Sequence, residues 1–276
     1  MSDMHSPLGE KAAVKVAKHA GESKGHWYTK EGHQIAQVMK VDGSGYTKCT
    51  LAHARKLDLA PGCTTIVDCA DKPQLTLWLQ RQAIMSALTL PIRDNESEAQ
   101  WLERVEHDMG ETARKAAEAG SAIHAAVQAF ISRESYDPAY EAHVRGATEE
   151  LQRVFGQQFW RAEQSVVSPL GVATKIDMLS DGWILNWKTK DGDQVALAKL
   201  QLYDEYAQQS AFELSCLTPR RAAIGFISRT HPGVTRTVEI PQKDLKRGME
   251  MFKALLRFWQ NRCKPFYRPS WATEDA

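Results

Sequence analysis

Two strand-like runs separated by Asp181-Gly182 constrain this 276-residue chain more than any other stretch of it. The runs, residues 171–179 and 183–190, are rich in residues that favour strands, and Asp-Gly between two such runs is a strong signal for a hairpin with a two-residue loop. We therefore expect two antiparallel strands in a fixed register at this place.

In that register Asp177 lies directly opposite Asn186. Directly opposed side chains share one face of a sheet, with Cβ atoms roughly 4.5–5.5 Å apart. Lys188 follows Asn186 by two residues, and the period of a strand places it on the same face. Two oxygen-bearing side chains at such a separation can hold a hard divalent cation such as Mg²⁺. A lysine beside the cation could steady a scissile phosphate or activate water.

The order of these residues resembles the signature of the PD-(D/E)XK nuclease superfamily. That signature is an Asp, a short strand connection, then Asp or Glu, any residue, and Lys. Here Asp177 is followed by eight intervening residues and then Asn186-Trp187-Lys188. The chain departs from the pattern at position 186, where Asn keeps one acceptor oxygen but removes a formal charge. The resemblance implies a restriction-endonuclease-like core and metal-dependent hydrolysis of nucleic acid.

Two positions before the hairpin extend the resemblance. Residues 120–124, Gly-Ser-Ala-Ile-His, fit the helical Gly-x-x-(apolar)-His pattern of the RecB-like branch, which implies that His124 contributes to the metal site. Taken alone, a His at the border of an apolar helix stripe is more often structural. Glu163 sits where related nucleases often carry a Glu before the hairpin; the alternative is a solvated strand carboxylate.

A helix after the hairpin carries a further match. Residues 202–211 are similar to the Tyr…Gln helix of the RecB-like branch, and matching by order places its glutamine at Gln209, with Gln208 as a near competitor. A glutamine there can bond a phosphate or the attacking water. Tyr203 would then pack beside it.

The segment from Thr64 to Trp78 resembles the N-terminal part of phage-type exonucleases, where it helps to form the entrance for a DNA end. The match lies in the order Thr-Thr-Ile, then Asp-Lys-Pro-x-Leu-x-x-Trp. The expected DNA-binding residues are Thr64, Thr65, Lys72, Tyr203 and Lys190.

Composition sets broader limits. The formal net charge is +1, so contact with nucleic acid must come from local basic patches rather than bulk attraction. No 18-residue apolar run predicts a membrane span, and residues 1–7 do not resemble a signal peptide. Five scattered cysteines favour reduced thiols in a cytoplasm. Only Cys263 lies near the C-terminus, so the iron–sulfur cluster of some relatives is not expected.

The expected fold is an α/β (α+β) arrangement: a mixed central sheet of about five strands, carrying the hairpin and flanked by helices. We expect an N-terminal, mainly helical DNA-entrance portion over residues 1–110 and a nuclease core over residues 111–276. The expected helices lie near 73–88, 100–105, 114–131, 140–155, 197–217 and 242–262, the expected further strands near 26–28, 160–167, 222–228 and 234–240, and a short helix or a mobile arm within 1–25.

The resemblance assigns the chain a function: a metal-dependent DNA exonuclease of the phage recombination or replication type, using Mg²⁺ or Mn²⁺. It makes His124, Asp177 and Asn186 metal ligands, with Glu163 as a further candidate. Lys188 would stabilise charge on the phosphate or help to deprotonate water, and Gln209 would orient that water. The expected partners are DNA ends, single-stranded or duplex, and a single-strand annealing protein, with no membrane.

Asn186 leaves two explanations open. It is a substitution introduced into an active enzyme to trap a DNA complex, or a natural divergence into a non-catalytic protein that binds DNA ends or single strands. The first is favoured, because Asp177, Lys188, His124 and Gln209 all surround a single missing charge. A third alternative, an α/β domain unrelated to nucleic acid, requires the hairpin match to be chance.

Overall fold

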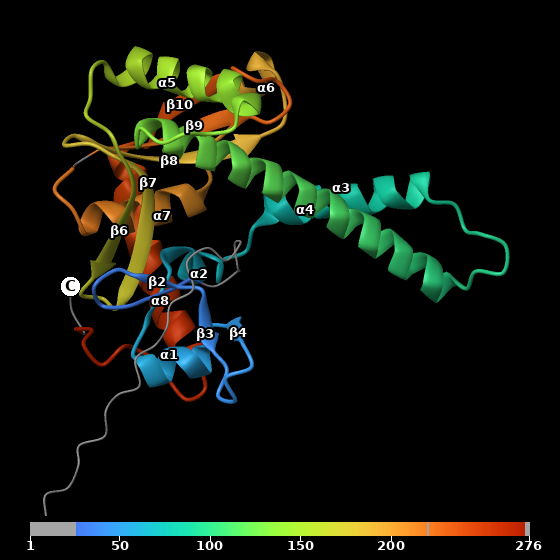
Figure 1. The fold of residues 1–276 in the computed structure, drawn as a ribbon, viewed down its shortest axis with the longest axis horizontal. Coiled ribbons are helices and arrows are strands. Elements are labelled where there is room, and N and C mark those ends of the chain that lie inside the picture. The colour runs from blue at the N-terminus through green and yellow to red at the C-terminus, as the bar shows by residue number, and fades with distance from the viewer. Residues whose placement is uncertain (1–25, 220, 274–276) are drawn as a thin grey trace, which may run out of the picture.

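A five-stranded mixed sheet forms the centre of the molecule in the computed structural model, which describes residues 26–219 and 221–273. The strand order is β10-β9-β8-β7-β6, and all neighbours are antiparallel except β8 and β9, which are parallel. Helices lie on both faces of this sheet (Figure 1). The predicted mixed α/β fold is therefore confirmed. The strands are β6 (Arg161–Ser168), β7 (Val172–Leu179), β8 (Trp183–Lys190), β9 (Arg221–Ser228) and β10 (Thr235–Glu239).

The β7–β8 hairpin has the predicted register. Met178 pairs with Leu185 and Leu179 pairs with Ile184, so the loop consists of Asp181-Gly182 flanked by a single closing backbone hydrogen bond. Asp-Gly adopts such tight turns readily because Gly tolerates backbone angles that other residues avoid. The second predicted hairpin is also confirmed, since β9 and β10 pair in antiparallel register over five residues each.

Strand β8 is covered on both faces, which explains why four consecutive residues, Ile184 to Trp187, are all buried. On one face Leu185 and Trp187 pack against helices α4 (Glu98–Ile131) and α5 (Glu141–Phe155), the second of which follows the short 3₁₀ helix η1 (Pro138–Tyr140). On the other face Ile184 belongs to a core that includes residues of α6 (Gln194–Ala198) and α7 (Asp204–Ser215).

The N-terminal portion packs along helix α8 (Gln242–Arg262), the predicted amphipathic C-terminal helix. Trp259 of α8 contacts two of its apolar clusters, one around Trp27 and one around Ile66. The first cluster also contains Tyr267, whose hydroxyl donates to two backbone carbonyls near α1. This portion contains the strands β1 (Trp27–Tyr28), β2 (Gln34–Ile35), β3 (Gln37–Met39), β4 (Tyr46–Lys48) and β5 (Ala60–Pro61), and the helices α1 (Leu51–Leu57) and α2 (Cys63–Val67).

Helix α3 (Pro73–Thr89) and the first half of α4 form an arm that projects from the body of the molecule (Figure 1). Pro at the first position of α3 begins the helix as predicted, because its missing N–H has no partner in a first turn. The arm carries many exposed apolar side chains: Leu75, Leu77, Ile84, Met85, Leu88, Ile92 and Leu102.

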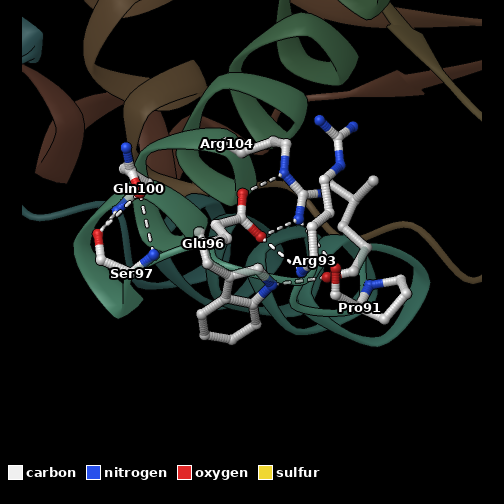
Figure 2. A network of polar contacts seen from close by, with 8 residues as sticks. Pro91, Arg93, Glu96, Ser97, Gln100 and Arg104 are labelled. Atoms are coloured by element: carbon white, nitrogen blue, oxygen red, sulfur yellow. Dashed lines mark hydrogen bonds and ion pairs between the residues drawn. The ribbon is translucent and has the colours of Figure 1, made fainter.

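Polar contacts order the tip of this arm (Figure 2). Arg104 donates two hydrogen bonds to the carboxylate of Glu96 and one to the carbonyl of Pro91. The side-chain hydrogen bonds from Arg104 hold the pKa of Glu96 down to about 2. Ser97 and Gln100 form a reciprocal capping box that begins α4.

Two helix predictions are wrong in detail. The helix expected at 100–105 and the long helix expected after it are one helix, α4, in which Arg114 forms i,i+3 and i,i+4 ion pairs with Glu111 and Glu118. The single helix expected over 197–217 is divided into α6 and α7. Arg236 donates to carbonyls at the end of α6 and so satisfies the groups that a continued helix would have used.

The predicted boundary between residues 110 and 111 falls inside α4, so the backbone has no break there. The portion before it contains five short strands besides its helices. The predicted helix or arm within residues 1–25 lies outside the described residues. All five cysteines are free thiols. Within residues 26–219 and 221–273, the helices are too short or too polar to cross a membrane.

Gly225 provides a test of how tightly β8 and β9 are packed. A Cβ atom at this position would lie 2.2 Å from the ring of Trp187, which is 2% exposed. We expect Gly225→Ala to lower the free energy of unfolding by about 1–3 kcal/mol, because the buried ring has no space into which to move. Urea unfolding monitored by tryptophan fluorescence measures this change.

Gly110→Ala is the matched control, since nothing lies within 4 Å of a Cβ atom there and the site is an exposed position within α4. It should raise the free energy of unfolding by about 0.5–1 kcal/mol, the usual gain from Gly to Ala in a helix. Equal unfolding midpoints for Gly225→Ala and the unmodified chain would contradict the packing described.

Candidate active site

The β7 and β8 backbones separate at Asp177. The antiparallel pairing ends at Met178 and Leu185, one step before the pair of Asp177 and Asn186. Beyond that step side chains replace the backbone ladder: the backbone N–H of Trp187 donates to Oδ2 of Asp177 at 2.7 Å, and Oδ1 of Asn186 lies 3.5 Å from the backbone nitrogen of Asp177. The pairing predicted to reach Asp177 and Asn186 therefore stops one step before them, and the carboxylate of Asp177 bonds the backbone of β8 instead.

Glu163 of β6 lies across from this irregularity. Its neighbours Ala162 and Gln164 pair with β7, whereas Glu163 itself has a left-handed backbone with φ of 54° and takes no place in the ladder. Its carboxylate forms an ion pair with Lys175 of β7. Glu163, one of the side chains predicted to bind metal, is thus engaged by a lysine.

His124 reaches the site from α4. Helix α4 approaches β8 closely at Gly120, where an added Cβ atom would lie 2.6 Å from Oγ1 of Thr189. One turn later, Nδ1 of His124 lies 4.0 Å from Oδ2 of Asp177, and both side chains are partly exposed. The small residue in the Gly-x-x-x-His segment therefore has a physical role: it lets the helix carry its histidine to the hairpin.

The side chain of Asn186 contacts the carboxylate of Glu213, a residue that the sequence did not predict as part of the site. Its Nδ2 donates to Oε2 of Glu213 at 2.6 Å, while Nε2 of Gln209 and Oγ1 of Thr174 donate to Oε1 of the same group at 2.9 and 3.1 Å. Glu213 is fully buried. Burial raises its pKa to about 7, and the hydrogen bonds from the two amides oppose that rise. The available signal was an acid at a helical spacing of four after Gln209, within the apolar face of α7.

Lys188 lies on the same face of β8 as Asn186, as predicted. Its Nζ lies 3.5 Å from Oε1 of Gln209 and 5.8 Å from the ring centre of Tyr206. Gln208, the alternative to Gln209, is buried and directed toward Met251. Of the two glutamines, Gln209 is the one that contacts the lysine.

A cavity of about 390 Å³ lies between α2, α4, α7 and the end of β8, and it contains His124, Lys188 and Gln209. Of the predicted DNA-binding residues, Thr64, Lys72 and Lys190 line this cavity, whereas Thr65 and Tyr203 do not.

The charges in the cavity are of both signs. Lys72 forms ion pairs with Asp68 and Glu205. Within the described part of the chain, Lys188 and Lys190 have no carboxylate at ion-pair distance. Burial lowers the pKa of Lys190, whose Nζ lies over the ring of Tyr203. Two lysines without carboxylate partners at one cavity suit an anionic ligand.

The donor set beside the cavity fits a hard cation that keeps much of its water. Asp177 and His124 supply a carboxylate and an imidazole within 4.0 Å of each other. Within residues 26–219 and 221–273, no three His, Cys, Asp or Glu side chains converge on one point. Mg²⁺ commonly takes only one or two carboxylates from a protein and completes its shell with water and phosphate oxygens. The residues present therefore fit a weakly held Mg²⁺ or Mn²⁺, and a closed all-protein site does not form.

Comparison of the sequence with known protein families finds no matching family, and comparison with curated proteins finds no relative. Among solved structures, the chain has a likeness to an alkaline exonuclease from Laribacter hongkongensis, with 10% identity, a TM-score of 0.28, and coverage of 48% of this chain and 77% of that one.

Two further solved structures are similar at the same level. The same exonuclease in complex with dAMP gives 12% identity, a TM-score of 0.26, and coverage of 52% and 92%. The protein SSO0001 gives 16% identity, a TM-score of 0.25, and coverage of 46% and 67%. Scores this low carry no weight for the activity of this chain, so the function has to be argued from the site itself.

The buried carboxyl of Glu213 predicts a pH dependence of stability. Its pKa is about 7 in the folded chain and near 4.5 when exposed, so the folded state retains a proton that the unfolded state releases. The resulting stability is full below about pH 4.5 and is lost as the pH rises through 7. Relative to Glu213→Gln, the unmodified chain should lose about 3 kcal/mol of unfolding free energy between pH 4.5 and 8.

Urea unfolding of both chains at intervals of half a pH unit measures this difference. Other titrating groups change both chains alike and cancel. Parallel stability curves for the two chains would show that the Glu213 carboxyl has an ordinary pKa.

Proposed function

We propose that this chain is a metal-dependent deoxyribonuclease that acts at DNA ends. The observation that carries the proposal is the meeting of Lys188, Gln209 and His124 in one cavity beside Asp177. An acid, an imidazole, a lysine and an amide are groups that can support metal-assisted phosphodiester hydrolysis, and here they come from separate elements, β7, α4, β8 and α7.

Each group has a role in this proposal. Asp177 and His124 are the residues that would hold Mg²⁺ or Mn²⁺. When bound, the cation supplies positive charge to the phosphate and lowers the pKa of a water ligand. Lys188 stabilises the negative charge that develops on the phosphate oxygens, and the side-chain oxygen of Gln209 orients the ammonium group or a water.

Action at ends rests on the similarity of residues 64–78 to phage-type exonucleases. The presence of Thr64 and Lys72 at the cavity wall supports it, because both come from that segment. A single-strand annealing protein as a partner stays a prediction of the same similarity.

Asn186 bears on how active the chain is. The sequence predicts impairment, since the hairpin carries one carboxylate where relatives carry two. The competing function is binding of DNA ends or single strands without cleavage, with Asn186 as the observation in its favour.

Cleavage tests the proposed function directly. End-labelled linear and closed circular DNA are incubated with Mg²⁺ and either the unmodified chain or Asn186→Asp. At least one of these two proteins should degrade linear DNA and leave circles intact. Lys188→Ala in the active background should lower the rate by about 10²–10³-fold, the usual loss when a group that stabilises transition-state charge is removed.

Lys246→Ala is the control, because this exposed lysine lies on α8 and does not line the cavity. It should cleave at the rate of its parent. Binding of DNA ends with no cleavage by either protein would establish the competing function instead.

The lysines of the cavity wall predict a second property, a steep dependence of DNA affinity on salt. Binding measured with Ca²⁺ in place of Mg²⁺ should weaken linearly on a plot of log affinity against log salt, because phosphate contacts release counterions. Lys190→Ala should reduce that slope by about one unit and weaken binding to all sequences alike. Lys246→Ala should leave the slope unchanged, and a flat salt response would argue against DNA as the ligand.

A further inference from the structure

Glu213 is a buried acid at the centre of the site, and no role described so far requires it. It is fully buried on α7, and its two oxygens accept hydrogen bonds from Asn186, Gln209 and Thr174. Removing a carboxylate from water is costly unless donors replace the lost hydration. Three side chains from three elements provide those donors here.

The carboxylate also determines how the two amides are turned. An ionised carboxylate only accepts hydrogen bonds, so the NH₂ groups of Asn186 and Gln209 must both face Glu213. Their oxygens must then face the other way. The oxygen of Asn186 lies 3.5 Å from the backbone nitrogen of Asp177, and the oxygen of Gln209 lies 3.5 Å from Nζ of Lys188.

We propose that Glu213 is a positioning acid of this site: it supplies from α7 the negative charge that Asn186 does not supply, and it turns the oxygens of Asn186 and Gln209 toward Asp177 and Lys188. The proposal rests on the nuclease function proposed above. It implies that the chain with Asn186 has every group that the site needs, because helix α7 supplies the acid that strand β8 lacks.

The contact between residues 186 and 213 supports this arrangement. An Asp at 186 would bring a second carboxylate to within about 3 Å of Glu213 in a buried place, and two such groups cannot both ionise at low cost. Asn at 186 instead donates to Glu213 at 2.6 Å. The pair therefore carries one charge in a stable form, and exchanging acid and amide between the two positions keeps that charge.

Four chains test the proposal: the unmodified chain, Glu213→Gln, Asn186→Asp, and the double variant that exchanges the two groups. The rate of linear DNA digestion with Mg²⁺ is measured at pH 8, at temperatures below each unfolding midpoint. The unmodified chain should cleave. Glu213→Gln should lose about 10²-fold in kcat with little change in KM. This pattern is expected when a variant loses stabilisation of the transition state and still binds its substrate normally.

The double variant should recover most of the lost kcat, which a role of Glu213 in stability alone would not produce. Asn186→Asp alone should give no gain, because the two acids share a proton. Calorimetric titration with Mn²⁺ in the absence of DNA is the second measurement: Glu213→Gln should bind it about 10-fold more weakly, and the double variant should bind it as the unmodified chain does.

Two results would overturn the role of Glu213 and leave the nuclease function standing. One is unchanged kcat in Glu213→Gln. The other is faster cleavage by Asn186→Asp than by the unmodified chain, which would identify position 186 as the place of a lost acid. If no chain cleaves, the nuclease function fails, and Mn²⁺ affinity decides the rest: equal affinities in the unmodified chain and Glu213→Gln would overturn the positioning role as well.

Discussion

The buried carboxylate of Glu213 is the constraint on which the site depends. An unpaired carboxylate in a protein interior costs several kcal/mol, so each of its donors is held in place. Those donors come from β7, β8 and α7 itself, through Thr174, Asn186 and Gln209. Since Lys188 follows Asn186 by two residues on the same face of β8, fixing the carboxylate also fixes the lysine against the helix. The buried hydrogen bonds of Glu213 thus fix the positions of Gln209 and Lys188 in the cavity wall.

The topology of the sheet explains why helix α7 lies beside Asn186 and Lys188. Strands β8 and β9 are parallel, and parallel neighbours need a crossover connection that returns the chain to the same end of the sheet. Helices α6 and α7 are that connection, so α7 is laid across the sheet face toward which Asn186 and Lys188 point. The antiparallel hairpin brings Asp177 to the same place, and the close approach at Gly120 brings His124. One hairpin, one crossover and one close helix contact are sufficient to assemble the site.

Local signals in the sequence predicted much of this arrangement. Asp181-Gly182 predicted the hairpin register, and the helices expected near 73–88, 140–155 and 242–262 correspond to α3, α5 and α8. The contacts that were missed are long-range: Glu213 meets Asn186 across 27 residues and Thr174 across 39. No helical or strand period relates such positions. The sequence also did not predict the separation of the strands at Asp177, where a side chain replaces a backbone group as hydrogen-bond acceptor. A register predicts only which residues face each other.

When the hairpin is considered alone, Asn186 is the one departure from the nuclease signature that the hairpin resembles, because that signature has an acid at this position. With α7 in place it is one half of a donor–acceptor pair whose other half is an acid. If Asn186 had only replaced a carboxylate, a second carboxylate within hydrogen-bond distance of its nitrogen would not be expected. Glu213 would also lose a donor if position 186 were an acid, and would then be buried beside a like charge. The identities of residues 186 and 213 are therefore coupled by electrostatics, and the function of one cannot be assigned without the other.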